Sequence, residues 1–193
     1  MVLYLSIIFA CMIIISLFNL LFGCDIYGFS PLYAWLGVVI GTLFMIVIDA
    51  IIATITVILP KSWFSPYRKI FTVFPKERAF YEKIKIRKWK DKVFASIGWD
   101  KRQVKDTNDN EYLFRFLTET CIAEFMHVIS IFVGFLLIFV FPLEYVWCFG
   151  FPIALVNAFL QLLPVFIQRY NRPKLLKLYE YNKKIAERKN KSA

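Results

Sequence analysis

The first sixty residues of this chain contain no lysine and no arginine. The whole chain has 24 of these residues against 14 aspartates and glutamates, and every cation lies at or after Lys61. A formal net charge of +10 invites a nucleic-acid interpretation. A long apolar segment without a cation indicates a membrane instead, so nucleic acid is not expected as a partner.

Cysteine and histidine are also scarce. The four cysteines, Cys11, Cys24, Cys121 and Cys148, show no C-x-x-C spacing, and His127 is the only histidine. This pattern predicts neither a metal site nor a disulfide scaffold. Cys24 and Cys148 are both expected near the outer face, where they could pair, but the cysteines are better interpreted as apolar filling. With 59% hydrophobic residues and only 7 glycines, the composition also excludes a disordered or collagen-like chain.

Four apolar segments are long enough to cross a bilayer, which takes about 20 residues of helix. They are residues 2–22, 32–59, 121–141 and 145–167. The first is interpreted as an uncleaved helix, because it has no basic start and is longer than the apolar core of a signal peptide. The fourth contains Pro152 and Pro164, which are tolerated in lipid when neighbouring helices satisfy the freed carbonyls.

The position of the cations predicts how these segments cross the membrane. Fifteen lysines and arginines lie between residues 61 and 115, and the other nine lie between 169 and 191. The short connections 23–31 and 142–144 have none. Cytoplasmic loops carry the positive charge, so both termini and the connection 61–117 are predicted to be cytoplasmic. We therefore expect a single-domain, all-α integral membrane protein, multi-pass, with four transmembrane helices and a cytoplasmic tail at 169–193.

The connection 61–117 alternates aromatic and basic residues, which is typical of a segment lying at the membrane interface. Residues 83–87 alternate like a strand, but Ile86, Trp89 and Val93 share one face of a helix, and a helix is favoured. Residues 100–111 are polar and are predicted to form an exposed loop.

An ionisable residue within a span suggests a functional site. Thr120, Glu124 and His127 share one face of the predicted third helix, and Glu119 lies about a quarter turn away. Glu124 could orient His127 as a general base that removes a proton from a hydroxyl. The alternative is a hydrogen-bonded histidine at the membrane boundary. Asp49 in the second span needs a partner, with His127, Asn157 and Gln161 as the candidates, and its role is either helix packing or catalysis.

Two basic motifs have two interpretations each. Arginine pairs can grip a phosphate or carboxylate, or they can anchor a helix end at the interface, with Pro173 ending the helix. The first motif contains Gln168, Arg169, Asn171 and Arg172, and the second consists of Arg87, Lys88, Trp89, Lys90 and Asp91. Taken alone, both motifs favour the anchor.

Together these segments resemble a known family. Arg87-Lys-Trp-Lys-Asp91, then Glu119-Thr-x-x-Ala-Glu124-x-x-His127, then Gln168-Arg-Tyr-Asn-Arg-Pro173, resemble the glycosyl-4,4'-diaponeurosporenoate acyltransferase family in order and spacing. These are small bacterial membrane enzymes that attach a fatty acid to the sugar of a glycosylated carotenoid. The resemblance covers roughly Pro60 to Leu178.

The resemblance implies a membrane acyltransferase acting on a hydroxyl of a glycosylated lipid, at the cytoplasmic leaflet of a bacterial cell membrane. The expected partners are membrane lipid, a lipid-like acceptor and an acyl donor, either acyl coenzyme A or acyl carrier protein. No cofactor is expected, and a homo-oligomer is compatible with the sequence. Two other functions remain open, a non-catalytic scaffold of a lipid-synthesis complex and a small oligomeric transporter.

Overall fold

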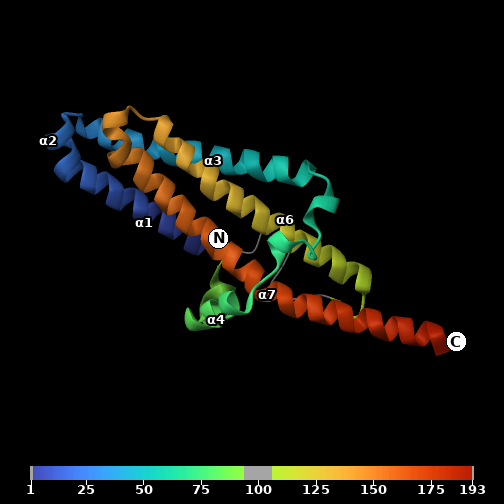
Figure 1. The fold of residues 1–193 in the computed structure, drawn as a ribbon. Coiled ribbons are helices and arrows are strands. Elements are labelled where there is room, and N and C mark those ends of the chain that lie inside the picture. The colour runs from blue at the N-terminus through green and yellow to red at the C-terminus, as the bar shows by residue number, and fades with distance from the viewer. Residues whose placement is uncertain (1, 94–105, 193) are drawn as a thin grey trace. The chain divides into compact units, whose positions relative to one another are not determined.

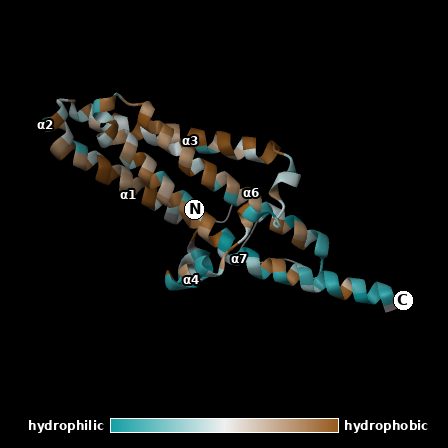
Figure 2. Cartoon of the chain, in the orientation of Figure 1, coloured by the Kyte–Doolittle hydropathy of each residue, from teal (hydrophilic) through white to brown (hydrophobic). Residues whose placement is uncertain are grey.

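The computed structural model describes residues 2–93 and 106–192, and every regular element in these ranges is helical (Figure 1). Four helical segments are long and apolar enough to cross a membrane, so the predicted fold class is confirmed. The helices are α1 (Val2–Phe18), α2 (Cys24–Tyr27), α3 (Pro31–Ile58), α4 (Pro75–Lys83), α5 (Ile86–Trp89), α6 (Asn110–Gly134) and α7 (Phe151–Ser192). Hydrophobic residues dominate α1 and α3, whereas the end of α7 is hydrophilic (Figure 2).

The chain groups into two compact units, which are described separately. Unit 1 comprises Met1–Val57 and Met126–Leu163, and unit 2 comprises Ile58–Phe125 and Pro164–Ala193. Unit 1 thus holds α1, α3, the end of α6 and the beginning of α7. Unit 2 holds the predicted connection, the beginning of α6 and the rest of α7.

In unit 1, two glycines of α3 lie close to η7 (Val146–Gly150) and to the beginning of α7. A Cβ added at Gly37 would lie 2.7 Å from the ring of Phe149, and one at Gly41 would lie 2.7 Å from Ile153 Cδ1. The four-residue spacing places both glycines on one face of the helix. This is the small-residue pattern that lets membrane helices pack tightly, and it explains why Phe149 is fully buried.

The prolines of the fourth span are accommodated by hydrogen bonds from two side chains, one on α1 and one on η1 (Asn19–Gly23), the turn that follows α1. A proline in a helix leaves the carbonyl four residues earlier without its backbone donor. For Pro164 that carbonyl belongs to Leu160, and it accepts a hydrogen bond of 2.9 Å from the Tyr4 hydroxyl. For Pro152 it belongs to Cys148, and it accepts one of 2.9 Å from Asn19 Nδ2. Neighbouring side chains therefore supply the donors that the prolines lack.

Helix α6 begins earlier than the third predicted span. Asp109 caps it, because its Oδ1 accepts hydrogen bonds from the backbone N–H groups of Glu111 and Tyr112 at 2.9 and 3.1 Å. The last two residues of the predicted loop 100–111 are therefore helical, and residues 100–105 lie outside the described part of the chain. The prediction of an entirely non-helical loop was wrong at this end because its polar residues include a helix cap.

Pro173 does not end helix α7, contrary to the prediction. The helix runs through Pro164 and Pro173 to Ser192. Residues beyond Pro173 are held by contacts within unit 2: the Tyr179 ring packs 5.5 Å from that of Phe114, and Asn182 Nδ2 donates to the Thr107 carbonyl at 2.6 Å. Proline removes only one backbone hydrogen bond, and these tertiary contacts offset that loss.

The connection in unit 2 folds into short helical pieces instead of one long element. They are η2 (Lys61–Phe64), η3 (Lys69–Phe71), α4, α5 and η4 (Lys90–Lys92). Phe64 and Phe71 pack with Cys121 of α6, and Tyr81 and Ile86 pack with Tyr170 of α7. The helix favoured over a strand near residues 83–87 is confirmed, since α5 starts at Ile86 after a turn at Lys85.

Candidate functional site

The first cluster of polar groups, in unit 2, centres on Arg169 of α7. Its guanidinium contacts five acceptors. Nε and Nη2 bind the two carboxylate oxygens of Glu77, Nη1 binds Glu124 Oε1 at 2.5 Å, and the carbonyls of Ile70 and Thr72 accept at 3.2 and 2.9 Å. A guanidinium has five N–H donors, so protein groups already engage the full donor set of Arg169.

Arg172, one helical turn further along α7, is more deeply buried, with 2% of its surface exposed. Its Nη1 pairs with Glu124 Oε2 at 2.5 Å and donates to the Phe71 carbonyl at 3.1 Å. Its Nε and Nη2 donate to the hydroxyl and the carbonyl of Thr120 at 3.1 and 3.0 Å. The two oxygens of Glu124 thus each face one arginine, which compensates a carboxylate that is 4% exposed.

The electrostatics of this arginine cluster stabilise its charged state. Burial alone would raise the pKa of Glu77, but the hydrogen bonds from Arg169 and Tyr81 outweigh burial and leave that pKa lowered. The same carboxylate accepts a hydrogen bond from Tyr81, and burial together with this contact raises the pKa of that hydroxyl. The cluster therefore ties α4 and the segment 70–72 to α6 and α7.

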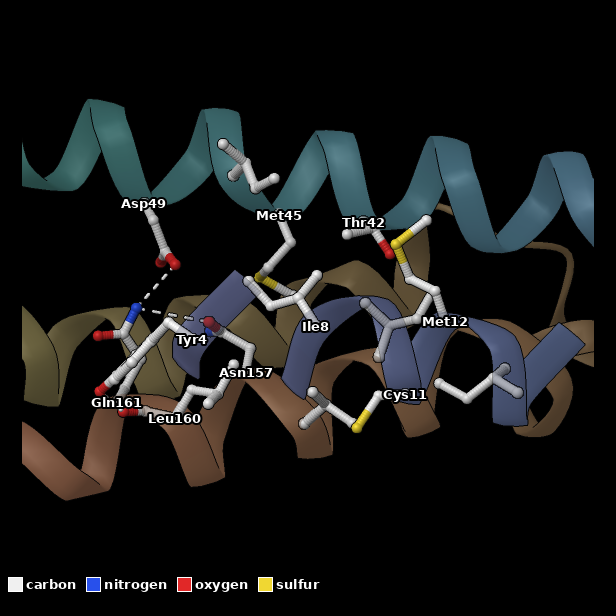
Figure 3. Close-up of a pocket in the computed structure, with 14 residues that line it drawn as sticks. Tyr4, Ile8, Cys11, Met12, Thr42, Met45, Asp49, Asn157, Leu160 and Gln161 are labelled. Atoms are coloured by element: carbon white, nitrogen blue, oxygen red, sulfur yellow. Dashed lines mark hydrogen bonds between the residues drawn. The ribbon is translucent and has the colours of Figure 1, made fainter. Parts of the chain in front are cut away.

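The second cluster lies in unit 1 and joins three helices in a chain of hydrogen bonds. Gln161 of α7 donates through Nε2 to Asp49 Oδ2 of α3 at 2.7 Å (Figure 3). Its Oε1 lies 2.5 Å from Nδ1 of His127 of α6. Because the amide nitrogen faces the carboxylate, the amide oxygen is the acceptor and His127 Nδ1 carries the proton. In the neutral ring the lone pair then resides on Nε2.

Asn157, one turn before Gln161, completes this polar strip. Its Oδ1 accepts from Gln161 Nε2 at 3.4 Å, and its Nδ2 donates to the Ser130 carbonyl at 3.3 Å. Gly134 makes room for it, since a Cβ there would lie 2.7 Å from Asn157 Nδ2. We refer to Asp49, Gln161 and His127 as the histidine chain.

The structure gives the predicted pair Glu124 and His127 different partners. Glu124 is ion-paired with the two arginines, and His127 is hydrogen-bonded to Gln161. The orienting role that the sequence assigned to Glu124 therefore passes to Gln161. Sequence reasoning named Gln161 only as a candidate partner of Asp49, and that pairing is present. The signal for its second contact was its place in an apolar span, where an amide needs two partners.

The predicted basic motif at Arg87 lines an open groove in unit 2. The groove has a volume of about 390 Å³ and is lined by Glu82, Lys85, Ile86, Arg87, Lys88 and Tyr170. Among the described residues, the Arg87 guanidinium makes one hydrogen bond, from Nε to the Tyr170 hydroxyl at 2.6 Å. Lys85 adopts a left-handed backbone with φ of 54°, a conformation that is uncommon for lysine and concentrates at functional sites.

The other predicted residues have lesser contacts. Trp89 donates through Nε1 to the Ile84 carbonyl at 3.1 Å, and Lys90 pairs with Asp91 at 3.8 Å on the surface. Thr120 lies beneath Arg172, as described above. Glu119, Gln168 and Asn171 are half-buried, and within residues 2–93 and 106–192 no hydrogen bond of their side chains is found.

Comparison with known proteins places these residues in a family. The family model for glycosyl-4,4'-diaponeurosporenoate acyltransferase matches residues 60–181, which is well over half of the chain. No curated protein sequence and no solved structure matches the chain. All three motifs that carried the resemblance lie inside the matched range, and α1 lies outside it, as predicted. The chain therefore belongs to the glycosyl-4,4'-diaponeurosporenoate acyltransferase family.

Proposed function

We propose that this protein is a membrane acyltransferase that transfers a fatty-acyl chain to a sugar hydroxyl of a glycosylated carotenoid or similar lipid. Family membership supports the carotenoid acyltransferase activity. The observation that carries the proposal further is the histidine chain, which presents an imidazole with a defined tautomer among apolar helices.

His127 acts as the general base in this proposal. Its Nε2 takes the proton of the attacking hydroxyl while the hydroxyl oxygen bonds to the carbonyl carbon of a thioester donor. The C–S bond then breaks, and the imidazolium returns the proton to the leaving thiolate. The products are an ester and a free thiol, so no oxidant or further reactant is needed. Gln161 holds the ring in the required tautomer, and Asp49 fixes the orientation of the Gln161 amide.

For the phosphates of the donor, the groove at Arg87 is favoured over the arginine cluster. The donors of Arg169 are occupied by protein acceptors, and Arg172 is buried. Lys85, Arg87 and Lys88 are exposed and line an open groove. They fit the pyrophosphate of coenzyme A or the phosphopantetheine arm of acyl carrier protein. The cation distribution supports a cytoplasmic location for both termini and for this groove.

The test of the proposal is a His127→Ala substitution, assayed in a host that supplies the glycosylated carotenoid. Lipid extracts should contain the acylated product with the wild-type protein, and the rate should fall about 10²- to 10⁴-fold in the variant. Phe132→Ala is the matched control, because Phe132 lies on the same helix and is 69% exposed. An unchanged product level in a stably folded His127→Ala protein would rule out His127 as the base.

A second experiment tests the donor groove. Replacing Arg87 and Lys88 together by alanine should raise the KM for acyl coenzyme A roughly tenfold at low salt and leave kcat nearly unchanged. Replacing Lys183 and Lys184, which are exposed near the end of α7, removes the same charge elsewhere and should have little effect. Equal KM values in the two double variants would leave the Arg87 motif as a membrane anchor.

A further inference from the structure

A pocket of about 120 Å³ lies within unit 1, between α1, α3 and the beginning of α7 (Figure 3). Its walls are mostly aliphatic or sulfur-containing side chains. They include Ile8, Cys11, Met12, Ile15, Met45 and Ile46. The proposed mechanism does not use these residues.

The pocket has one polar end. Asp49, Asn157 and Gln161 lie together there, whereas Met12 and Thr42 lie toward the other end (Figure 3). Gln161 is also the residue that hydrogen-bonds His127. A molecule occupying the pocket would therefore have its apolar part along α1 and its other end beside the histidine chain.

We infer that this pocket binds a segment of the saturated hydrocarbon chain of the acyl donor and so sets which acyl lengths are transferred. The inference rests on the proposed function, because it takes the acyl carbonyl to react beside the histidine chain. The lining suits a flexible chain: Met12 and Met45 are unbranched and adapt to irregular shapes. Tyr4 is the one aromatic residue of the lining, and its hydroxyl is held by the Leu160 carbonyl, so few ring faces are present to stack on a rigid polyene.

The dimensions fit a chain segment. An apolar cavity of about 150 Å³ stays dry and binds benzene, so the pocket is large enough for a short run of methylene groups. The lining residues of α7 extend from Ile153 to Gln161, which corresponds to about 12 Å along a helix axis. The rest of a long acyl chain would have to pass Cys11 and Met12 at the end away from Asp49 and Gln161, so the width of that end decides whether a long chain is accepted (Figure 3).

Most of the pocket lies outside the part of the chain that defines the family. The α1 and α3 residues precede residue 60, whereas the family match covers residues 60–181. The polar residues Asn157 and Gln161 lie inside the match. Asp49 of the histidine chain precedes the match, so the residues assigned to chain-length selection are the apolar lining residues of α1 and α3, which the proposed mechanism does not use.

The first test narrows the pocket with Cys11→Phe and measures acyl transfer from octanoyl, lauroyl and palmitoyl thioesters, presented on coenzyme A and on acyl carrier protein. The ratio of kcat/KM for palmitoyl to that for octanoyl should fall at least about tenfold. Ile14→Phe is the matched control, because Ile14 lies one turn further along α1 and is 64% exposed; it should leave the ratio unchanged. An unchanged ratio in Cys11→Phe would overturn the inference.

A second measurement remains informative if Cys11→Phe is inactive with every donor. Wild-type protein in nanodiscs is irradiated with palmitoyl coenzyme A that carries a diazirine in its chain, and the labelled peptides are identified by mass spectrometry. Labels should concentrate on the pocket residues of α1 and α3, and excess palmitoyl coenzyme A should remove them. Labelling spread over exposed faces of these helices, equal labelling from a diazirine phospholipid, or displacement by carotenoid alone would each overturn the inference.

The failure of this inference and the failure of the proposed function give different results. If His127→Ala abolishes transfer from every thioester and Cys11→Phe keeps the wild-type length preference, the reaction mechanism stands and the pocket assignment fails. If His127→Ala stays active while Cys11→Phe shifts the preference, the pocket assignment stands and another group acts as the base.

Discussion

Each unit of the chain places a carboxylate among largely apolar helices, but the two carboxylates have different partners. In unit 2, Glu124 faces two guanidinium groups, and each of its oxygens is paired with one of them. In unit 1, no ion pair of Asp49 is found within the described residues, and its carboxylate receives a hydrogen bond from the neutral amide of Gln161. In the first cluster the carboxylate is neutralised by the arginines beside it. In the second, the carboxylate is connected through the Gln161 amide to the imidazole of His127.

This difference indicates two kinds of role. Groups whose donors and acceptors are all engaged within the protein hold the fold, and removing one of them leaves the others buried and uncompensated. The neutral amide of Gln161 instead fixes the orientation of the His127 ring without placing a charged group against it. We therefore expect substitutions in the arginine cluster to affect mainly stability and those in the histidine chain to affect mainly rate.

The largest predicted effect is on stability. Arg172→Met should lower the free energy of unfolding by about 3 to 5 kcal/mol, because it leaves the Glu124 carboxylate with one cation fewer in a buried site. Thermal or denaturant unfolding in detergent measures the change. Lys177→Met on the same helix, where the side chain is exposed, should have little effect. Equal stability of the two variants would contradict a structural role for Arg172.

The next effect is on rate. Gln161→Met removes the hydrogen bond to His127 Nδ1 and should lower kcat about 10- to 100-fold, which corresponds to the loss of one hydrogen bond to a charged group. Since His127 is the only histidine, labelling with ¹⁵N-histidine gives a single ring whose tautomer NMR reads directly. The Nδ1–H form should dominate in the wild type and decrease in the variant.

Asp49→Asn is the conservative control for the Gln161→Met substitution. Its side-chain oxygen can still accept from Gln161 Nε2, so the tautomer and most of kcat should be retained. A Gln161→Met protein with the wild-type NMR spectrum and kcat would show that the histidine chain does not position the ring.

Much of the fold was predictable from the sequence, and the reason is physical. A helix in lipid satisfies the hydrogen bonds of its own backbone and needs only an apolar run. The apolar runs in the sequence were therefore enough to locate the four spans. Helix ends depend on local contacts instead. The cap at Asp109 and the continuation past Pro173 are decided by one side chain and by tertiary packing, which periodicity does not contain.

The partners of polar side chains were less predictable. Sequence spacing placed Glu124 and His127 on one helical face, but a face does not determine which neighbouring helix supplies the partner. Glu124 is ion-paired with Arg169 and Arg172, which lie more than forty residues later in the chain. His127 is hydrogen-bonded to Gln161. The three motifs that carried the resemblance lie in the range that the family model matches, whereas their mutual contacts required the structure.

The pH dependence of stability gives a smaller effect that bears on the arginine cluster alone. Because the pKa of Glu77 is lowered in the fold, its contribution is present above the ordinary carboxyl range and is lost as the pH falls through the lowered value. Glu77→Gln should therefore lower the melting temperature at neutral pH and flatten its decline in acid. Glu82→Gln is the control, since Glu82 forms an exposed pair with Arg78. Parallel pH profiles for the wild type and Glu77→Gln would contradict the assignment.

The smallest predicted effect is the loss of stability when a single neutral hydrogen bond near Pro164 of α7 is removed. Tyr4→Phe removes the donor to the Leu160 carbonyl, which Pro164 deprives of its backbone partner. The expected loss is about 0.6 to 1 kcal/mol of unfolding free energy, as is typical of hydrogen bonds between membrane helices. With Pro164→Ala the backbone N–H of residue 164 returns, so the same Tyr4→Phe change should cost clearly less. A double-mutant cycle measures this coupling, and equal costs in both backgrounds would mean that the tyrosine does not compensate the proline.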